Sequence, residues 1–93
     1  MGKPIGPVNR RKSKTPSEVF GRAVTELRLR AKLSQANLAA SLGYSVYYLG
    51  KIEQGKANAS CDVMAAIARY FDMSIGHLWL YAEKLAKRKA SRS

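Results

Sequence analysis

The chain has 93 residues, enough for one domain, and carries 17 Lys and Arg against six Asp and Glu, which gives a formal net charge of +11 at pH 7. No run of 18 uncharged apolar residues occurs, and no apolar stretch follows the basic N-terminus, so we expect neither a transmembrane helix nor a secretory signal. A single Cys, a single His and six scattered carboxylates argue against a disulfide framework, a structural zinc site and an enzyme, so we expect a cytoplasmic protein without metal or cofactor.

Basic residues gather at the two ends of the chain. Residues 1–14 hold five of them and no acid, including Arg10 and Arg11, and residues 84–93 hold five more. We expect a disordered basic arm over residues 1–14, because it has Pro and Gly but almost no large apolar side chain, and a basic tail over residues 84–93. Two interpretations stay open: solvated ends that keep the protein soluble, and electrostatic contacts to a polyanion.

The first predicted helix begins the central domain, which we place over residues 15–83. Its start is a capping box, in which Thr15 is the N-cap, Pro16 takes the first helical position and Glu18 takes the third. Apolar residues then follow at helical spacing from Phe20 to Ala31, which predicts one buried stripe.

The second and third predicted helices are short and closely spaced. Ser34 caps a helix over residues 35–42, which ends at Gly43 because glycine readily adopts the left-handed conformation of that position. Ser45 caps the third helix, over residues 46–54. So short a connection does not suit a packed antiparallel hairpin, and it fits a helix-turn-helix, in which the two helices cross steeply.

Two further helices complete the predicted domain. Ser60 caps the fourth helix and Ser74 caps the fifth, and each is followed by an apolar stripe at helical spacing. No strand-like alternation of apolar and polar residues occurs along the chain. The sequence therefore predicts an all-α fold.

The third helix has an outer side that is unusual for a solvated helix. At about 100° per residue, Leu49 and Ile52 fall on the core side, and the opposite side lacks the Glu–Lys pairs common on exposed helices. Its groups suit DNA base edges, because a methyl group contacts thymine, Lys donates to guanine and Gln pairs with adenine. An ordinary exposed surface is the alternative, and composition alone does not decide between the two. The outer residues are Val46, Tyr47, Gly50, Lys51 and Gln54.

These segments resemble the Cro/CI helix-turn-helix family, also called XRE-like. The resemblance rests on Leu-Ser-Gln at 33–35, Leu-Ala at 38–39, the turn glycine and Ile-Glu-x-Gly at 52–55, and it covers about residues 18–80. It implies a five-helix, lambda-repressor-like DNA-binding domain. It also implies a sequence-specific transcriptional regulator that binds double-stranded DNA, usually as a homodimer.

The resemblance implies two kinds of DNA contact. Gln35, which begins the second helix, and Lys56, which follows the third, match positions that contact phosphate. Tyr44 in the turn, together with Arg10 and Arg11 in the basic arm, are further candidates for phosphate contacts. The positions that face the bases are Val46, Tyr47, Gly50 and Lys51.

Two of the base-facing positions depart from the family pattern, because Val46 and Gly50 stand where many members carry polar residues. Glycine also weakens a helix by about 0.5–1 kcal/mol relative to alanine. We therefore expect Tyr47 and Lys51 to carry most of the sequence specificity. Gly50 either allows a closer approach to DNA or leaves few direct base contacts.

Two structural roles also follow from the resemblance. Arg28 and Glu53 match an ion pair between the first and third helices, which sets the helix geometry without touching DNA. The fifth helix matches a frequent dimer contact. The candidate dimer residues are Ile75, Leu78, Trp79 and Tyr81.

Three functions remain open at this point. The first is a dimeric single-domain repressor or controller of transcription, which acts by covering a promoter or by contacting polymerase, and Gly-Lys-x-Asn-x-Ser at 55–60 resembles restriction–modification controller proteins. The second is an antitoxin-like module that binds a protein partner such as a toxin, with DNA binding secondary. The third is a non-specific nucleic-acid binder driven by the basic ends.

Overall fold

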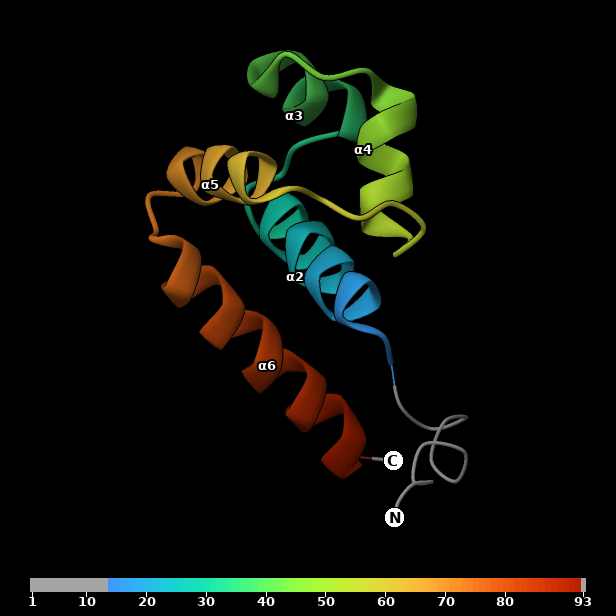
Figure 1. Cartoon of the computed structure of the whole chain (residues 1–93), viewed down its shortest axis with the longest axis vertical. Helices are drawn as coiled ribbons and strands as arrows, with labels where there is room; N and C mark the ends of the chain where they lie inside the picture. The colour runs from blue at the N-terminus through green and yellow to red at the C-terminus, as the bar shows by residue number, and fades with distance from the viewer. Residues whose placement is uncertain (1–13, 93) are drawn as a thin grey trace.

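The computed structural model describes residues 14–92, which form five α-helices, labelled α2 to α6 in Figure 1. They span Pro16–Arg30 (α2), Gln35–Leu42 (α3), Val46–Glu53 (α4), Cys61–Tyr70 (α5) and Ile75–Arg92 (α6). No strand occurs within the described residues, and the predicted all-α, five-helix fold is confirmed. Apart from Lys14, the basic arm predicted over residues 1–14 lies outside the described part of the chain.

Every helix begins where a hydroxyl side chain caps its N-terminus, as the sequence predicts. In the capping box of α2, the Glu18 amide donates to Thr15 Oγ1 at 3.1 Å and the Thr15 amide donates to Glu18 Oε1 at 3.0 Å. Each of the other helices has a serine whose Oγ accepts from the backbone N–H three residues later. These serines are Ser34, Ser45, Ser60 and Ser74.

Helices α2 to α5 all end in the same backbone motif. In each, one residue takes a left-handed conformation, and its N–H and that of the next residue donate to carbonyls of the last turn. This motif reverses the chain within a few residues, so the connections stay short. The left-handed residues are Lys32 (φ 61°), Gly43 (φ 79°), Gly55 (φ 76°) and Asp72 (φ 62°).

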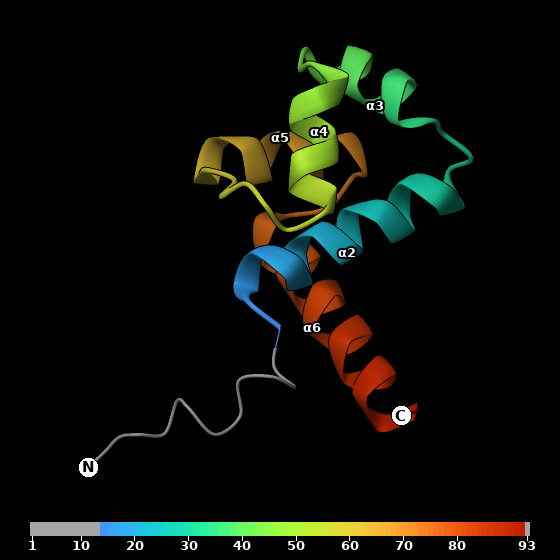
Figure 2. The same ribbon diagram turned by 90° about the vertical axis from the view of Figure 1, so that its right-hand side faces the viewer.

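Helix α2 runs through the middle of the molecule, with α3, α4 and α5 towards one end and α6 along its other side (Figures 1 and 2). Its predicted stripe from Phe20 to Leu27 is buried or half-buried. Ala31, predicted at the end of that stripe, is exposed because the helix has already ended at Arg30. The core takes fully buried side chains from all five helices: Val24, Leu38, Leu49, Ile52, Ile67 and Leu78.

The C-terminal end of α4 comes very close to α2. A Cβ atom at Gly21 would lie 2.7 Å from the carbonyl oxygen of Glu53, and one at Gly55 would lie 2.8 Å from the Cα of Glu18. Both positions therefore need glycine. The prediction overlooked Gly21, although a glycine within a predicted helix is itself a sign of close packing.

The basic segment predicted as a tail over residues 84–93 continues α6 as far as Arg92. Lys, Arg, Ala and Leu all favour helix, and Leu85 is buried, which anchors this part of α6 to the body. The C-terminal end of α6 lies at the opposite end of the molecule from α3 and α4 (Figures 1 and 2).

None of the helices in the described residues is both long and apolar enough to cross a membrane.

Candidate nucleic-acid interface

Helix α4 lies on the outside of the molecule and faces the viewer in Figure 2. Its inner side chains, Leu49 and Ile52, are 0% and 1% exposed, as the helical spacing predicts. On its other side, Val46 is 47% and Tyr47 is 71% exposed. A branched apolar side chain and a large aromatic therefore project from a surface helix. Burial in the monomer core does not explain why these side chains are apolar.

Lys51 and Tyr47 contact each other on this exposed side of α4. The Lys51 ammonium lies 5.1 Å from the centroid of the Tyr47 ring, within the range of a cation–π interaction. Residues four apart share one side of a helix, so the contact keeps two predicted base-contacting groups together. Gly50 lies in the same turn and is half-buried.

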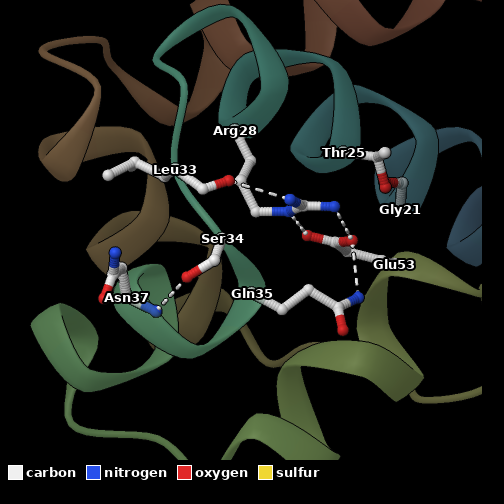
Figure 3. Close-up of polar contacts among 8 residues, drawn as sticks. All are labelled: Gly21, Thr25, Arg28, Leu33, Ser34, Gln35, Asn37 and Glu53. Atoms are coloured by element: carbon white, nitrogen blue, oxygen red, sulfur yellow. Dashed lines mark hydrogen bonds and ion pairs between the residues drawn. The ribbon is translucent and has the colours of Figure 1, made fainter.

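The ion pair between Arg28 and Glu53, which the family resemblance implies, is present and joins α2 to α4 (Figure 3). Arg28 donates from Nε to Glu53 Oε2 at 2.7 Å and from Nη2 to Glu53 Oε1 at 3.1 Å. The side chains are 13% and 5% exposed, respectively. Two parallel bonds between planar groups fix direction as well as distance, so this pair sets how α4 lies against α2.

The same ion pair also orients α3. Arg28 Nη1 donates to the carbonyl oxygen of Leu33 at 2.9 Å, directly before the N-cap of α3, and Gln35 Nε2 donates to Glu53 Oε1 at 2.9 Å (Figure 3). The guanidinium and the carboxylate thus connect α2, α3 and α4. The sequence predicted the ion pair but neither of the two extra bonds.

The other residues predicted to contact phosphate lie at the ends of α4. Tyr44, in the turn before it, is half-buried and packs edge-to-face on Tyr48, with ring centroids 5.5 Å apart. Lys56 is exposed just after α4, where its amide donates to the carbonyl of Lys51 at 2.9 Å. Arg10 and Arg11 lie outside the described residues.

Of the residues predicted at a dimer contact, Leu78 belongs to the monomer core and Trp79 packs partly against it. Leu78 is 0% exposed, so it cannot contact a second copy, and its assignment to the dimer interface is wrong. Trp79 is half-buried: its ring centroid lies 5.3 Å from that of Phe20, and its indole N–H donates to Met64 Sδ at 3.3 Å. An apolar stripe shows which side of a helix is buried, but not whether its own chain buries it.

The remaining predicted dimer residues, Ile75 and Tyr81, are half-buried on α6. Leu80 is 51% exposed on the same helix, and the sequence analysis overlooked it because it falls among the polar residues of the outer side, such as His77 and Lys84. Leu80, on the outer side of α6, is a separate candidate contact for a second copy.

Within residues 14–92, no group of three or more His, Cys, Asp or Glu side chains lies close enough together to hold a metal ion. The candidate site is the surface formed by helices α3 and α4.

Comparison with solved structures finds the same fold in two crystal structures of a gene regulator. A similar structure is that of the clp gene regulator ClgR from Corynebacterium glutamicum, with a TM-score of 0.76, 20% identity and coverage of 85% of this chain and 84% of that one. A second crystal structure of ClgR has a TM-score of 0.71 at 21% identity, covering 77% of this chain and 94% of that one.

The restriction-modification controller protein C.AhdI from Aeromonas hydrophila is also similar, with 32% identity, a TM-score of 0.62 and coverage of 67% of this chain and 94% of that one. No curated protein matches the sequence. These similar structures are named as a gene regulator and a controller protein, and neither is named as an enzyme. The family model of the helix-turn-helix domain matches residues 19–78. The chain therefore belongs to the helix-turn-helix family of DNA-binding transcription regulators, of the Cro/CI (XRE-like) type.

Proposed function

We propose that the protein is a sequence-specific, homodimeric repressor or controller of transcription that reads an operator in double-stranded DNA. Helix α4 enters the major groove, which is wide enough to admit an α-helix. The observation that carries this proposal is the outer side of α4, where Val46 and Tyr47 are 47% and 71% exposed beside Lys51.

Two groups on the outer side of α4 each fit a base edge. The Val46 methyl groups suit the C5-methyl of thymine, and the Lys51 ammonium suits the O6 and N7 acceptors of guanine. The Tyr47 ring holds that ammonium 5.1 Å from its centroid before DNA arrives. Less side-chain entropy is then lost on binding, which favours affinity.

Phosphate contacts around α4 supply most of the affinity in this proposal, and the base contacts supply the discrimination. Gln35 begins α3, where the backbone N–H groups of a helix N-terminus favour an anion. Lys56 stands exposed beyond the other end of α4, and Tyr44 lies in the turn before it. Arg10 and Arg11 add further positive charge in the arm.

A homodimer places two copies of α4 on two half-sites about 34 Å apart, one turn of DNA. The similarity to a restriction-modification controller, at 32% identity, supports a controller rather than another class of regulator. Such a protein acts where the cell keeps its DNA, so a cytoplasmic location is part of the proposal. It represses by covering a promoter.

The proposal is tested by selecting bound sequences from random duplex DNA and then measuring variants on the enriched duplex. Lys51→Ala is expected to cost about 1–3 kcal/mol on that duplex and much less on random DNA, because a base contact is lost. Lys84→Ala is the matched control, since Lys84 is an exposed lysine on α6, and its effect is expected to be small and equal on both DNAs. An equal loss for Lys51→Ala on both DNAs contradicts the proposal. If no sequence is enriched, the protein is a non-specific binder.

A further inference from the structure

Gly50 occupies the middle of α4, a position where glycine destabilises a helix relative to alanine. Three other glycines, Gly21, Gly43 and Gly55, have a reason within the monomer. Gly21 and Gly55 have backbone atoms of a neighbouring helix so close that a Cβ atom would clash, and Gly43 and Gly55 have positive φ. Alanine is strained at such positions.

Gly50 has neither reason. It is not among the described residues with positive φ, and a Cβ atom there would meet only the side-chain amide of Gln35, at 3.9 Å. That distance is an ordinary van der Waals contact. The fold of the monomer therefore accepts alanine at this position.

The surroundings of Gly50 show what the missing side chain leaves open. Tyr47 and Gln54, one turn away on either side, are exposed, so Gly50 is a notch between projecting side chains. The Gln35 amide lies beneath this notch, and its hydrogen bond to Glu53 fixes its direction (Figure 3). A polar group of defined orientation thus lies at the base of a gap in the exposed side of α4.

We propose that Gly50 is a residue that determines affinity and specificity for double-stranded DNA, because its lack of a side chain lets a DNA strand approach α4 and reach the Gln35 amide. The inference rests on the proposed function and adds a steric requirement to it. A methyl group at position 50 fills the notch, separates the DNA from Gln35 and moves Tyr47 and Lys51 away from the base edges.

The test compares Gly50→Ala with Gly76→Ala, a second helical glycine, on α6, at which a Cβ atom would meet nothing within 4 Å. Both variants are expected to melt at or above the temperature of the parent, because alanine favours helix in both places. On the duplex selected by the parent, Gly50→Ala is expected to bind at least tenfold more weakly, and Gly76→Ala within threefold of the parent. Gly50→Leu, which fills more of the notch, is expected to lose more affinity than Gly50→Ala.

Binding by Gly50→Ala within threefold of the parent overturns the inference and leaves the proposed function intact. A melting temperature of Gly50→Ala well below that of the parent also overturns it, since glycine would then be needed by the monomer. If the parent itself selects no sequence, the proposed function fails and this inference fails with it.

Discussion

At the scale of single residues, Glu53 has the most connected environment near the candidate interface. It accepts two hydrogen bonds from Arg28 and one from Gln35, and its side chain is only 5% exposed. A carboxylate buried to this extent depends on its partners for solvation. The geometry of the helix-turn-helix therefore depends on Arg28.

Replacing Arg28 by alanine is expected to lower the free energy of unfolding by about 3 kcal/mol or more, because it leaves Glu53 buried without its charged partner. Urea denaturation followed by circular dichroism measures this loss. Arg22→Ala is the matched control: Arg22 is an exposed arginine of the same helix, and its loss is expected to change stability by about 0.5 kcal/mol or less. A loss below 1 kcal/mol for Arg28→Ala, on the order of the control, would show that the ion pair is not structural.

A second prediction concerns alanine at Gly21. The sign of its effect on stability shows whether close packing against α4 or helix propensity dominates. Alanine in place of a helical glycine normally stabilises, but a Cβ atom at Gly21 would lie 2.7 Å from the Glu53 carbonyl oxygen. Gly21→Ala is therefore expected to destabilise the protein by about 1–3 kcal/mol. Thermal unfolding measures the change, and a higher melting temperature would mean that α2 and α4 are not in such close contact.

Residue-scale features differed in how far the sequence could predict them. The Arg28–Glu53 pair came from the family resemblance, because a motif specifies both positions. The contact between Tyr47 and Lys51 could not be predicted, since spacing places two residues on one side of a helix but does not choose their rotamers. The bonds from Arg28 to Leu33 and from Gln35 to Glu53 needed the tertiary structure for the same reason.

At the scale of helices, the start and end signals specified most boundaries. Serine and threonine caps predicted all five starts, and Gly43 and Gly55 predicted two ends, because each satisfies backbone groups that a helix leaves free. The length of α6 was predicted poorly, since lysine and arginine suit both a solvated tail and a helix. Leu78 was misassigned because hydropathy does not identify the partner that buries a side chain.

The ends of α2 and α5 use residues other than glycine in the left-handed conformation, at Lys32 and Asp72. Replacing Lys32 by glycine is expected to stabilise the protein by about 0.5–1 kcal/mol, because glycine adopts positive φ without the Cβ penalty. Lys32→Ala removes the same charge and keeps the Cβ atom, so its effect is expected to stay small. Urea denaturation of both variants checks this, and an equal gain for Lys32→Ala would assign the effect to charge.

At the scale of the whole molecule, the proposed DNA-reading helix and the basic end of α6 lie at opposite ends (Figures 1 and 2). In the proposed complex, the basic end of α6 therefore does not reach the groove that receives α4 of the same copy. A dimer through α6 leaves both copies of α4 free for two half-sites. Exposed Leu80 gives α6 an apolar group for that contact.

The proposed dimer through α6 predicts that substitutions at two exposed leucines affect self-association differently. Leu80→Lys is expected to weaken self-association at least tenfold, because it places a charge in the contact between two copies of α6. Leu29→Lys changes a leucine on α2 that is 55% exposed, similar to the 51% of Leu80, and is expected to leave association unchanged. Sedimentation equilibrium measures both. A parent that stays monomeric, or a variant at Leu29 that dissociates while Leu80→Lys does not, contradicts a dimer through α6.

Whether α4 binds DNA is tested most directly by a nuclear magnetic resonance titration of the labelled protein with its selected duplex. We expect the largest changes in amide shifts over α4 and the N-terminus of α3, with the side chains of Tyr47 and Lys51 among the most affected. Unchanged resonances along α4, with the changes gathered instead on the basic half of α6, would contradict DNA binding by α4.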